Sequence, residues 1–218
     1  MSPEGEDSKH AEGRATVRLG VLLSGRGSNF LAIAESIRTG SLRGVEIAIV
    51  ISNVADAAGI LAAHQLGLPH AVLVSKGRPR AEHDADLTAC LREHQADLVI
   101  LAGYMRLLSP GFIAAFPNRI LNIHPSLLPA FPGLDAQQQA FDYGVKWTGC
   151  TVHFVDEHLD HGAIILQRAL PVLEEDDSHS LAERILVEEH IAYSEAIARV
   201  VSGEWEIQGR RYVKRQAR

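Results

Sequence analysis

Short apolar runs alternate with amphipathic segments along the first half of the chain. The runs are brief and almost wholly apolar, which indicates buried strands, and apolar residues three to four positions apart between them indicate helices. The expected strands are Val17–Leu23, Val45–Ile51, His70–Val74, Leu98–Ala102 and Ile120–His124. The expected helices are Phe30–Arg38, Ala57–Leu66 and Arg80–His94. Strands that alternate with helices predict βαβ units and a mostly parallel sheet.

The pattern changes after the fifth expected strand. Thr148–Val155 and Ala163–Val172 are apolar runs separated only by a loop, which predicts an antiparallel hairpin. The spacing Ser180-x-x-Glu183 is typical of a capping box and predicts a long helix to about Val201. A short closing element is expected around Trp205, Ile207 and Tyr212. The sequence thus predicts a three-layer α/β/α fold with a mostly parallel sheet, an antiparallel C-terminal extension and a long C-terminal helix.

Composition narrows the class of protein. The chain has 218 residues, of which 46% are hydrophobic and 22% charged, a mix typical of soluble globular proteins. Residues 1–16 are polar and lack an apolar signal core, so we expect a disordered leader followed by a single domain over residues 17–218. The net charge of −6 argues against non-specific binding to nucleic acid or membranes. No apolar run approaches the roughly 20 residues of a membrane span. Two distant cysteines, with no CxxC, favour a reducing cytoplasm.

The most suggestive polar pair lies at the end of the strand Ile120–His124. Asn122 and His124 are two residues apart, so their side chains face the same side of the sheet, and Pro125 ends the strand. A hydrogen-bond donor beside a titratable ring suits chemistry at a carbonyl group. A histidine with a purely structural role is the alternative when such a residue stands alone. The residues that follow favour chemistry.

A glycine-rich loop, Ser24–Asn29 (SGRGSN), joins the first strand to the first helix. Its backbone N–H groups and the helix N-terminus favour an anion. Phe30 stands where the dinucleotide motif GxGxxG needs its third glycine, and Arg26-Gly27 replaces the Lys-Ser/Thr pair of a Walker A loop. A single phosphate monoester fits best, and a plain tight turn remains the alternative.

A dense group of histidines and carboxylates follows the Thr148–Val155 strand. Its members are His153, Asp156, Glu157, His158, Asp160 and His161. As metal ligands, His158, Asp160 and His161 could gather on a loop, but no HxxxH or HExxH helix pair supports this. As acid–base groups, Asp160 could orient or charge-balance His124, while His153 points into the same cleft. We favour the acid–base interpretation for His153 and Asp160, and a solvated loop for Asp156, Glu157, His158 and His161. We expect no metal.

Apolar side chains follow the fourth strand in Gly103–Leu108 (GYMRLL). They leave the sheet at its carboxyl edge, where open α/β sheets bind ligands. Packing beneath a loop is the alternative. Cys90 and Cys150 are most simply small buried apolar residues.

Together these motifs resemble the folate-dependent formyltransferases, most closely those that act on glycinamide ribonucleotide. The matching segments are Ser24–Asn29, Leu101–Ser109, Leu121–Pro129, Thr151–Phe154 and Leu159–Asp160. They occur in the family's order, and the resemblance runs from about Val17 to Val201. Departures from the usual family residues at Asp135, Gln137 and Leu186 concern substrate positioning and not the chemistry.

The resemblance implies a Rossmann-like formyltransferase fold and a reaction in de novo purine biosynthesis. A formyl group would pass from the co-substrate 10-formyltetrahydrofolate to the amine of 5′-phosphoribosylglycinamide. We therefore expect small-molecule substrates only, no nucleic-acid or membrane partner, and a monomer or homodimer. Hydrolysis of 10-formyltetrahydrofolate by the same site is one alternative, and a non-catalytic sensor of a phosphorylated ligand is a less favoured one.

The same resemblance assigns roles to individual residues. The implied catalytic residues are Asn122, His124 and Asp160, with His153 as a supporting positioner. The implied contacts to the phosphorylated acceptor are Gly27, Ser28, Asn29 and Glu189. The implied folate contacts are Arg80, Met105, Arg106, Leu107, Leu108, Asn122, Asp156 and Asp160.

Overall fold

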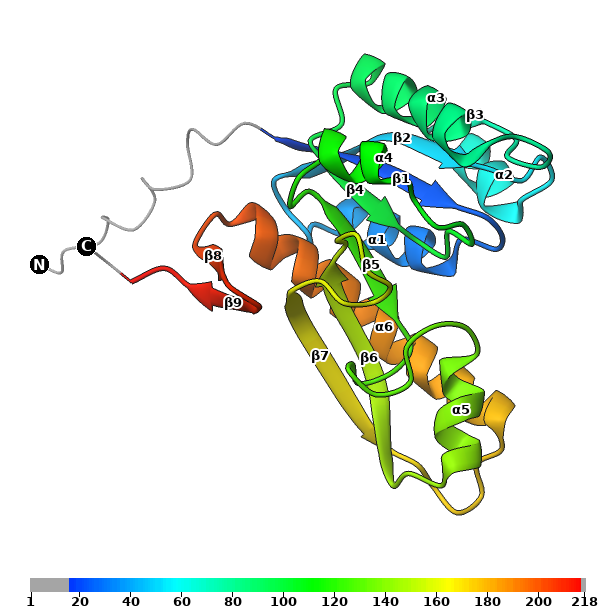
Figure 1. The fold of residues 1–218 in the computed structure, drawn as a ribbon, viewed down its shortest axis with the longest axis vertical. Helices are drawn as coiled ribbons and strands as arrows, with labels where there is room; N and C mark the ends of the chain where they lie inside the picture. The colour runs from blue at the N-terminus through cyan, green and yellow to red at the C-terminus, as the bar shows by residue number, and fades with distance from the viewer. Residues whose placement is uncertain (1–15, 217–218) are drawn as a thin grey trace, which may run out of the picture.

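The computed structural model describes residues 16–216, and one sheet runs through the molecule (Figure 1). The strands are β1 (Val17–Leu23), β2 (Val45–Ser52), β3 (His70–Val72), β4 (Leu98–Leu101), β5 (Ile120–His124), β6 (Trp147–Phe154), β7 (Ile164–Pro171), β8 (Trp205–Gln208) and β9 (Arg211–Lys214). They lie in the order β3-β2-β1-β4-β5-β6-β7-β9-β8. The expected leader, residues 1–16, lies outside the described residues apart from its last one.

Strand directions divide the sheet into two parts. Strands β1 to β5 pair in parallel. Strand β6 is antiparallel to both β5 and β7. The hairpin of β8 and β9 joins β7 where Arg211 pairs with Ile164. The mostly parallel sheet and its antiparallel extension, both predicted from the sequence, are confirmed.

Helices cover both faces of this sheet (Figure 1). They are α1 (Ser28–Arg38), α2 (Ala58–Gln65), α3 (Arg80–Glu93), α4 (Pro110–Ala115), α5 (Ala136–Tyr143) and α6 (Ser178–Val201). On one face, Leu87 of α3 and Phe112 of α4 join one hydrophobic core. On the other face, Phe30 of α1 and Tyr193 of α6 join a second core. The three-layer prediction is therefore confirmed. Among these helices, none has both the length and the apolar character needed to cross a membrane.

Two of the helices, α4 and α5, are missing from the sequence prediction. Helix α4 has only six residues, too few for a periodic pattern to show. Helix α5 begins with the polar run Ala136–Gln139 after Asp135, whose φ of 53° is left-handed, and it ends at Gly144. Its apolar residues are too sparse to indicate a helix.

The start of α6 differs from the expected capping box. Asp177, not Ser180, is the N-cap residue, and its carboxylate accepts hydrogen bonds from the backbone N–H groups of His179 and Ser180. The Ser180 hydroxyl oxygen in turn accepts a hydrogen bond of 2.9 Å from the backbone N–H of Asp177. The predicted box beginning at Ser180 is thus wrong by nearly one turn, because an aspartate caps as well as a serine.

Strand β1 supplies side chains to both cores. Leu19 and Val21 face the core beneath α1 and α6, whereas Leu22 faces the core beneath α3 and α4. Gly20 faces α3, and a Cβ atom there would lie 2.2 Å from Cδ2 of Leu91. Because protein cores are close-packed, any side chain at this position would push α3 away from the sheet.

Helix α6 contacts the carboxyl end of β4 and the neighbouring residues of β5. The fully buried Tyr193 hydroxyl lies 3.0 Å from the carbonyl oxygen of Leu101 and 2.9 Å from that of Leu121. Leu101 is the last residue of β4 and pairs with Asn122 of β5. The tyrosine therefore ties α6 to the edge of the sheet from which Asn122 and His124 project.

Candidate functional site

Strand β6 brings His153 directly opposite Asn122. The two residues pair across the antiparallel ladder, and Nδ2 of Asn122 lies 3.3 Å from Nε2 of His153. Nδ1 of His153 lies 2.7 Å from the Phe154 carbonyl oxygen and donates to it. In a neutral ring this leaves Nε2 as the acceptor for the Asn122 amide. Burial lowers the pKa of His153, which favours that neutral ring. The geometry thus sets the orientation of the Asn122 amide.

His124 is buried between two oxygen acceptors. Its Nε2 lies 2.8 Å from the Phe131 carbonyl oxygen, and its Nδ1 lies 3.4 Å from Oδ2 of Asp160. A ring that carries protons on both nitrogens donates toward both acceptors. The 3.4 Å separation is longer than a well-formed hydrogen bond of roughly 2.7–3.2 Å. In such a doubly protonated ring, the Nδ1–H group would be held only loosely by Asp160 and could donate to a further acceptor.

Asp160 is held in place from the loop between β6 and β7. Its side chain is only 9% exposed, and Oδ2 accepts a hydrogen bond of 2.8 Å from the backbone N–H of Gly133. Oδ1 lies 3.8 Å from Nε2 of His153. Asp160 adopts a φ of 49°, a left-handed conformation that non-glycine residues seldom adopt and that clusters at functional sites. One carboxylate thus faces both His124 and His153.

The glycine-rich loop Ser24–Asn29 turns from β1 into α1 at the same edge of the sheet. Gly27 caps α1 with a left-handed φ of 72°, and no acidic residue lies in the first turn of the helix. The loop and the segment that contains Met105 line a hollow of about 220 Å³. The Ser24 hydroxyl accepts a hydrogen bond of 2.8 Å from the Met105 backbone N–H and holds the two walls together. Gly27, Ser28 and Asn29 line this hollow at the N-terminus of α1, where backbone N–H groups have no partner within the helix.

A buried polar pair connects this loop to α6. Nδ2 of Asn29 donates a 2.8 Å hydrogen bond to Oε2 of Glu189, and both residues are more than nine-tenths buried. Burial raises the pKa of Glu189, although the hydrogen bond from Asn29 opposes that shift. Oδ1 of Asn29 is buried without a hydrogen-bond partner. A buried unpaired acceptor of this kind suits a donor group on a ligand.

The side chains expected to contact folate differ in exposure. Met105 is 71% exposed and Leu107 is 58% exposed, which is unusual for large apolar residues. Leu108 packs partly buried against the core beneath α3 and α4. Arg80 is exposed at the first residue of α3. Met105 and Leu107 thus offer the apolar surface at this edge.

Arg106 lies among these residues, but its guanidinium group is hydrogen-bonded within the protein. Its two terminal nitrogens donate hydrogen bonds of 2.9 and 3.0 Å to the backbone carbonyls of Ser75 and Arg78. Its Nε is buried without a partner. The guanidinium therefore fixes the loop that follows β3, and any contact with folate falls to other groups of this residue.

Neither Cys150 nor Ser126 has the surroundings of a nucleophile. Burial raises the pKa of the Cys150 thiol to about 12, so the thiol stays protonated. The Ser126 hydroxyl donates to the Ala130 carbonyl at 2.5 Å and has no basic partner. Neither of these two side chains is therefore activated for a covalent intermediate.

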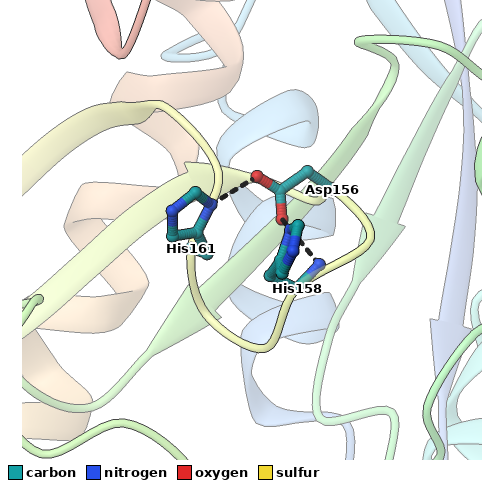
Figure 2. Close-up of side chains that lie close together, drawn as sticks. All are labelled: Asp156, His158 and His161. Carbon is teal, nitrogen blue, oxygen red and sulfur yellow. Dashed lines mark hydrogen bonds and ion pairs between the residues drawn. The ribbon is translucent and has the colours of Figure 1, made fainter.

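The remaining polar residues of the loop between β6 and β7 form a separate group (Figure 2). Nδ1 of His161 lies 2.8 Å from Oδ2 of Asp156, and Nδ1 of His158 lies 4.0 Å from Oδ1 of the same carboxylate. Glu157 is exposed and takes no part. Asp160, which the sequence offered as a third ligand beside His158 and His161, instead faces His124. The structure thus substitutes Asp156 for Asp160 in this group.

Sequence reasoning missed two backbone partners of the site. The Phe131 carbonyl accepts from His124, and the Gly133 N–H donates to Asp160. Both groups lie in the segment after Pro129, where Phe131 and Gly133 have positive φ values of 52° and 87°. The clustering of proline and glycine there indicates a loop, but backbone groups leave no residue-type signal that would assign a partner.

Comparison with known proteins extends these observations. Residues 17–197 match the family model described as formyl transferase. The chain is 46% identical over 189 residues to the trifunctional purine biosynthetic protein adenosine-3 of Drosophila melanogaster, covering 85% of this chain but only 14% of that protein. It is 40% identical over 184 residues to the phosphoribosylglycinamide formyltransferase of Escherichia coli, covering 84% of this chain and 86% of that protein.

Comparison with solved structures agrees with these sequence matches. Glycinamide ribonucleotide transformylase 1 from Symbiobacterium toebii superposes with a TM-score of 0.90 at 48% identity, covering 97% of this chain and 99% of that one. A formyltetrahydrofolate deformylase from Pseudomonas syringae has a TM-score of 0.84 at 26% identity, covering 91% of this chain and 66% of that one. The likeness is thus greater to the transformylase.

Proposed function

The chain belongs to the formyl transferase family, and we propose that it transfers a formyl group from 10-formyltetrahydrofolate to the primary amine of 5′-phosphoribosylglycinamide. One observation supports the proposal above the others. Asn122, His124 and Asp160 converge at the carboxyl edge of the sheet, the same edge that carries the glycine-rich loop. Acid–base groups and an anion site at one edge suit a reaction on a phosphorylated acceptor. The related transformylases, which match nearly full length, carry names with this activity.

In the proposed reaction, the acceptor's amine nitrogen attacks the formyl carbon. The new C–N bond gives a tetrahedral intermediate with a negatively charged oxygen. The Asn122 amide and a protonated His124 would donate hydrogen bonds to that oxygen, because each has a donor that the protein leaves incompletely engaged. His153 would keep the amide turned toward the reacting carbon.

The proton then has to move from the attacking nitrogen to the leaving nitrogen. Collapse of the intermediate breaks the bond between the formyl carbon and N10 of the folate, and N10 gains a proton as the acceptor nitrogen loses one. Asp160 would hold the charge of His124 and carry this proton directly or through water. These residues complete the transfer by hydrogen bonding and proton movement alone.

The glycine-rich loop would hold the acceptor's phosphate. The N-terminus of α1 favours an anion, and its first turn carries no acidic side chain to oppose one. The buried side chains of Glu189 and Asn29 would contact the sugar or the glycinamide portion of the acceptor. The hollow of about 220 Å³ is small, which favours one phosphate over a dinucleotide.

Folate would lie along the other side of the same edge. The exposed Met105 and Leu107 offer apolar contact to a flat ring system, and Arg80 offers a positive charge to the acidic tail. Leu108 and Arg106 would support this wall from behind. Asp156 and Asp160 would close the site from the loop between β6 and β7.

Hydrolysis of 10-formyltetrahydrofolate is the second candidate, because the chain also resembles a formyltetrahydrofolate deformylase. Water would replace the amine, and the same three residues would serve. The phosphate-binding geometry of the Ser24–Asn29 loop favours the transferase, since a hydrolase has no phosphorylated acceptor to hold. The test is to supply 10-formyltetrahydrofolate and glycinamide ribonucleotide and to identify the product by mass spectrometry. Formylated ribonucleotide is expected, and free formate as the sole product would support the hydrolase.

A further inference from the structure

Two imidazoles and one carboxylate meet on the surface of the loop between β6 and β7. Asp156, His158 and His161 each place one potential ligand atom within 4.8 Å of the other two. Figure 2 shows both rings beside the Asp156 carboxylate, His161 on one oxygen and His158 next to the other. The exposed fractions of the three side chains are 40%, 75% and 50%, so the group is open to solvent.

We propose that Asp156, His158 and His161 bind one divalent cation of the late first-row transition metals, with Zn²⁺ as the best-suited ion. Imidazole nitrogens are ligands of zinc, copper and nickel, whereas magnesium and calcium prefer sites made only of oxygen atoms. Three protein ligands from a single short loop leave a fourth position for water, a common zinc arrangement.

The distances are close to those that zinc requires. Ligands about 2.05 Å from a tetrahedral zinc ion lie about 3.3 Å from one another. The contact between His161 and Asp156 is 2.8 Å, and that between His158 and Asp156 is 4.0 Å. These two distances are to different oxygens of the carboxylate, and one ligand atom from each residue lies within 4.8 Å of the other two. The exposed rings therefore have to rotate about their χ angles to bring all three ligand atoms to the zinc spacing.

The Asp156 carboxylate is already positioned to act as a ligand. The His161 ring and the His158 backbone N–H both donate hydrogen bonds to the Asp156 carboxylate. The same two bonds fix the carboxylate between the rings.

Arg210, in the turn between β8 and β9, competes with the cation for His161. Its guanidinium contacts Nε2 of His161 and also donates to the His161 carbonyl oxygen at 2.8 Å. When Nε2 accepts from arginine, Nδ1 carries the proton and donates to Asp156. A cation on Nδ1 requires the opposite tautomer, with a proton on Nε2 that would face the guanidinium. Arginine contact and metal binding at this ring therefore exclude each other.

The cation site does not include the reacting groups, and it shares only Asp156 with the proposed folate contacts. Asp160 lies between the ligands in sequence but faces His124 and His153 on the inner side of the loop. The cation would therefore sit on the outer side of a loop whose inner side carries Asp160. The proposal depends on these loop contacts and not on the reaction that the protein catalyses.

Direct binding measurements test the proposal. Calorimetric titration of the full chain with ZnCl₂ is expected to show one site that His158→Ala and His161→Ala each weaken. Losing a residue that only supports a metal ligand typically costs about 10–100-fold in affinity, so losing a ligand is expected to cost at least that much. His179→Ala is the matched control, because His179 is an exposed histidine 3.5 Å from the Glu183 carboxylate but has no third ligand. Unchanged zinc affinity in both loop variants would overturn the proposal.

The competition with Arg210 gives a second, opposite test. Arg210→Gln is expected to tighten zinc binding, because it removes the guanidinium group that holds His161 in the tautomer with its proton on Nδ1. Arg211→Gln is its control, since the neighbouring arginine is also exposed and has no hydrogen bond to His161. Co²⁺ absorption spectra of the same variants report whether nitrogen ligands enter the coordination sphere. Weaker zinc binding in Arg210→Gln than in Arg211→Gln would show that the arginine supports the site, contrary to this account.

Discussion

Replacing Asp160 with asparagine removes a charge from the site while keeping its shape. Oδ2 of Asp160 accepts from Gly133 and faces His124, and the asparagine carbonyl oxygen can take over both contacts. The new amide nitrogen then occupies the place of Oδ1, which lies 3.8 Å from the acceptor Nε2 of His153. No buried group loses a partner, so we expect Asp160→Asn to fold with nearly wild-type Tm.

The expected loss of turnover follows from the charge. Two opposite unit charges 3.4 Å apart attract by roughly 5 kcal/mol when the effective dielectric constant is about 20. Water and local dipoles replace part of this attraction, so it is an upper bound. Acid–base groups contribute about 10²–10⁴-fold to rates, which corresponds to about 2.7–5.4 kcal/mol. We therefore expect kcat of Asp160→Asn to fall by two to four orders of magnitude.

Steady-state formyl transfer, with folate absorbance as the readout, measures this effect. Asp142→Asn is the control, because Asp142 is exposed on α5 and accepts only from Gln138. The control is expected to keep wild-type kcat and KM. Turnover within threefold of wild type in a folded Asp160→Asn protein would refute the role given to this carboxylate.

Three further predictions concern other parts of the site and its support. Gly27→Val is expected to raise KM for the phosphorylated acceptor much more than KM for folate, because it strains a φ of 72° beside the anion site; equal weakening of both ligands in a calorimetric titration would contradict this. Burial raises the pKa of Glu189, so its stabilising contribution is lost as pH rises above the carboxyl's ordinary value, and Glu189→Gln should gain Tm relative to wild type at pH 8 but not at pH 4. Tyr193→Phe removes a hydroxyl that contacts the backbone carbonyls of Leu101 in β4 and Leu121 in β5, which should cost about 0.5–1.5 kcal/mol in urea unfolding with little change in KM.

The alternation of strands and helices was predictable because buried positions are occupied by apolar residues, whose spacing differs between strands and helices. Strand β1 and strand β5 begin and end at the predicted residues, since each is a short apolar run bounded by polar or turn-forming residues. Helices α4 and α5 were not predictable. Their few core residues, such as Phe112 and Ala140, are too short a series to establish a 3.6-residue period. The cap of α6 was misassigned because two capping residues, Asp177 and Ser180, stand three residues apart.

The sequence predicted only those parts of the site that depend on the identity and spacing of side chains. The spacing of Asn122 and His124 places both at one strand end, and the register with β6 then brings His153 opposite Asn122. The approach of Asp160 to His124 depends on a loop conformation fixed by the Gly133 backbone N–H, which no residue pattern records. For the same reason the sequence did not indicate that Asp156, and not Asp160, joins the two exposed histidines.

The most direct test of the central claim is the dependence of folate turnover on the acceptor. Purified protein is mixed with 10-formyltetrahydrofolate, and the formation of tetrahydrofolate is followed with and without glycinamide ribonucleotide. The account predicts rapid formation only when the ribonucleotide is present, with one formylated product for each folate released. Equal rates in both mixtures would contradict it, because the anion site of the Ser24–Asn29 loop would then have no part in the reaction.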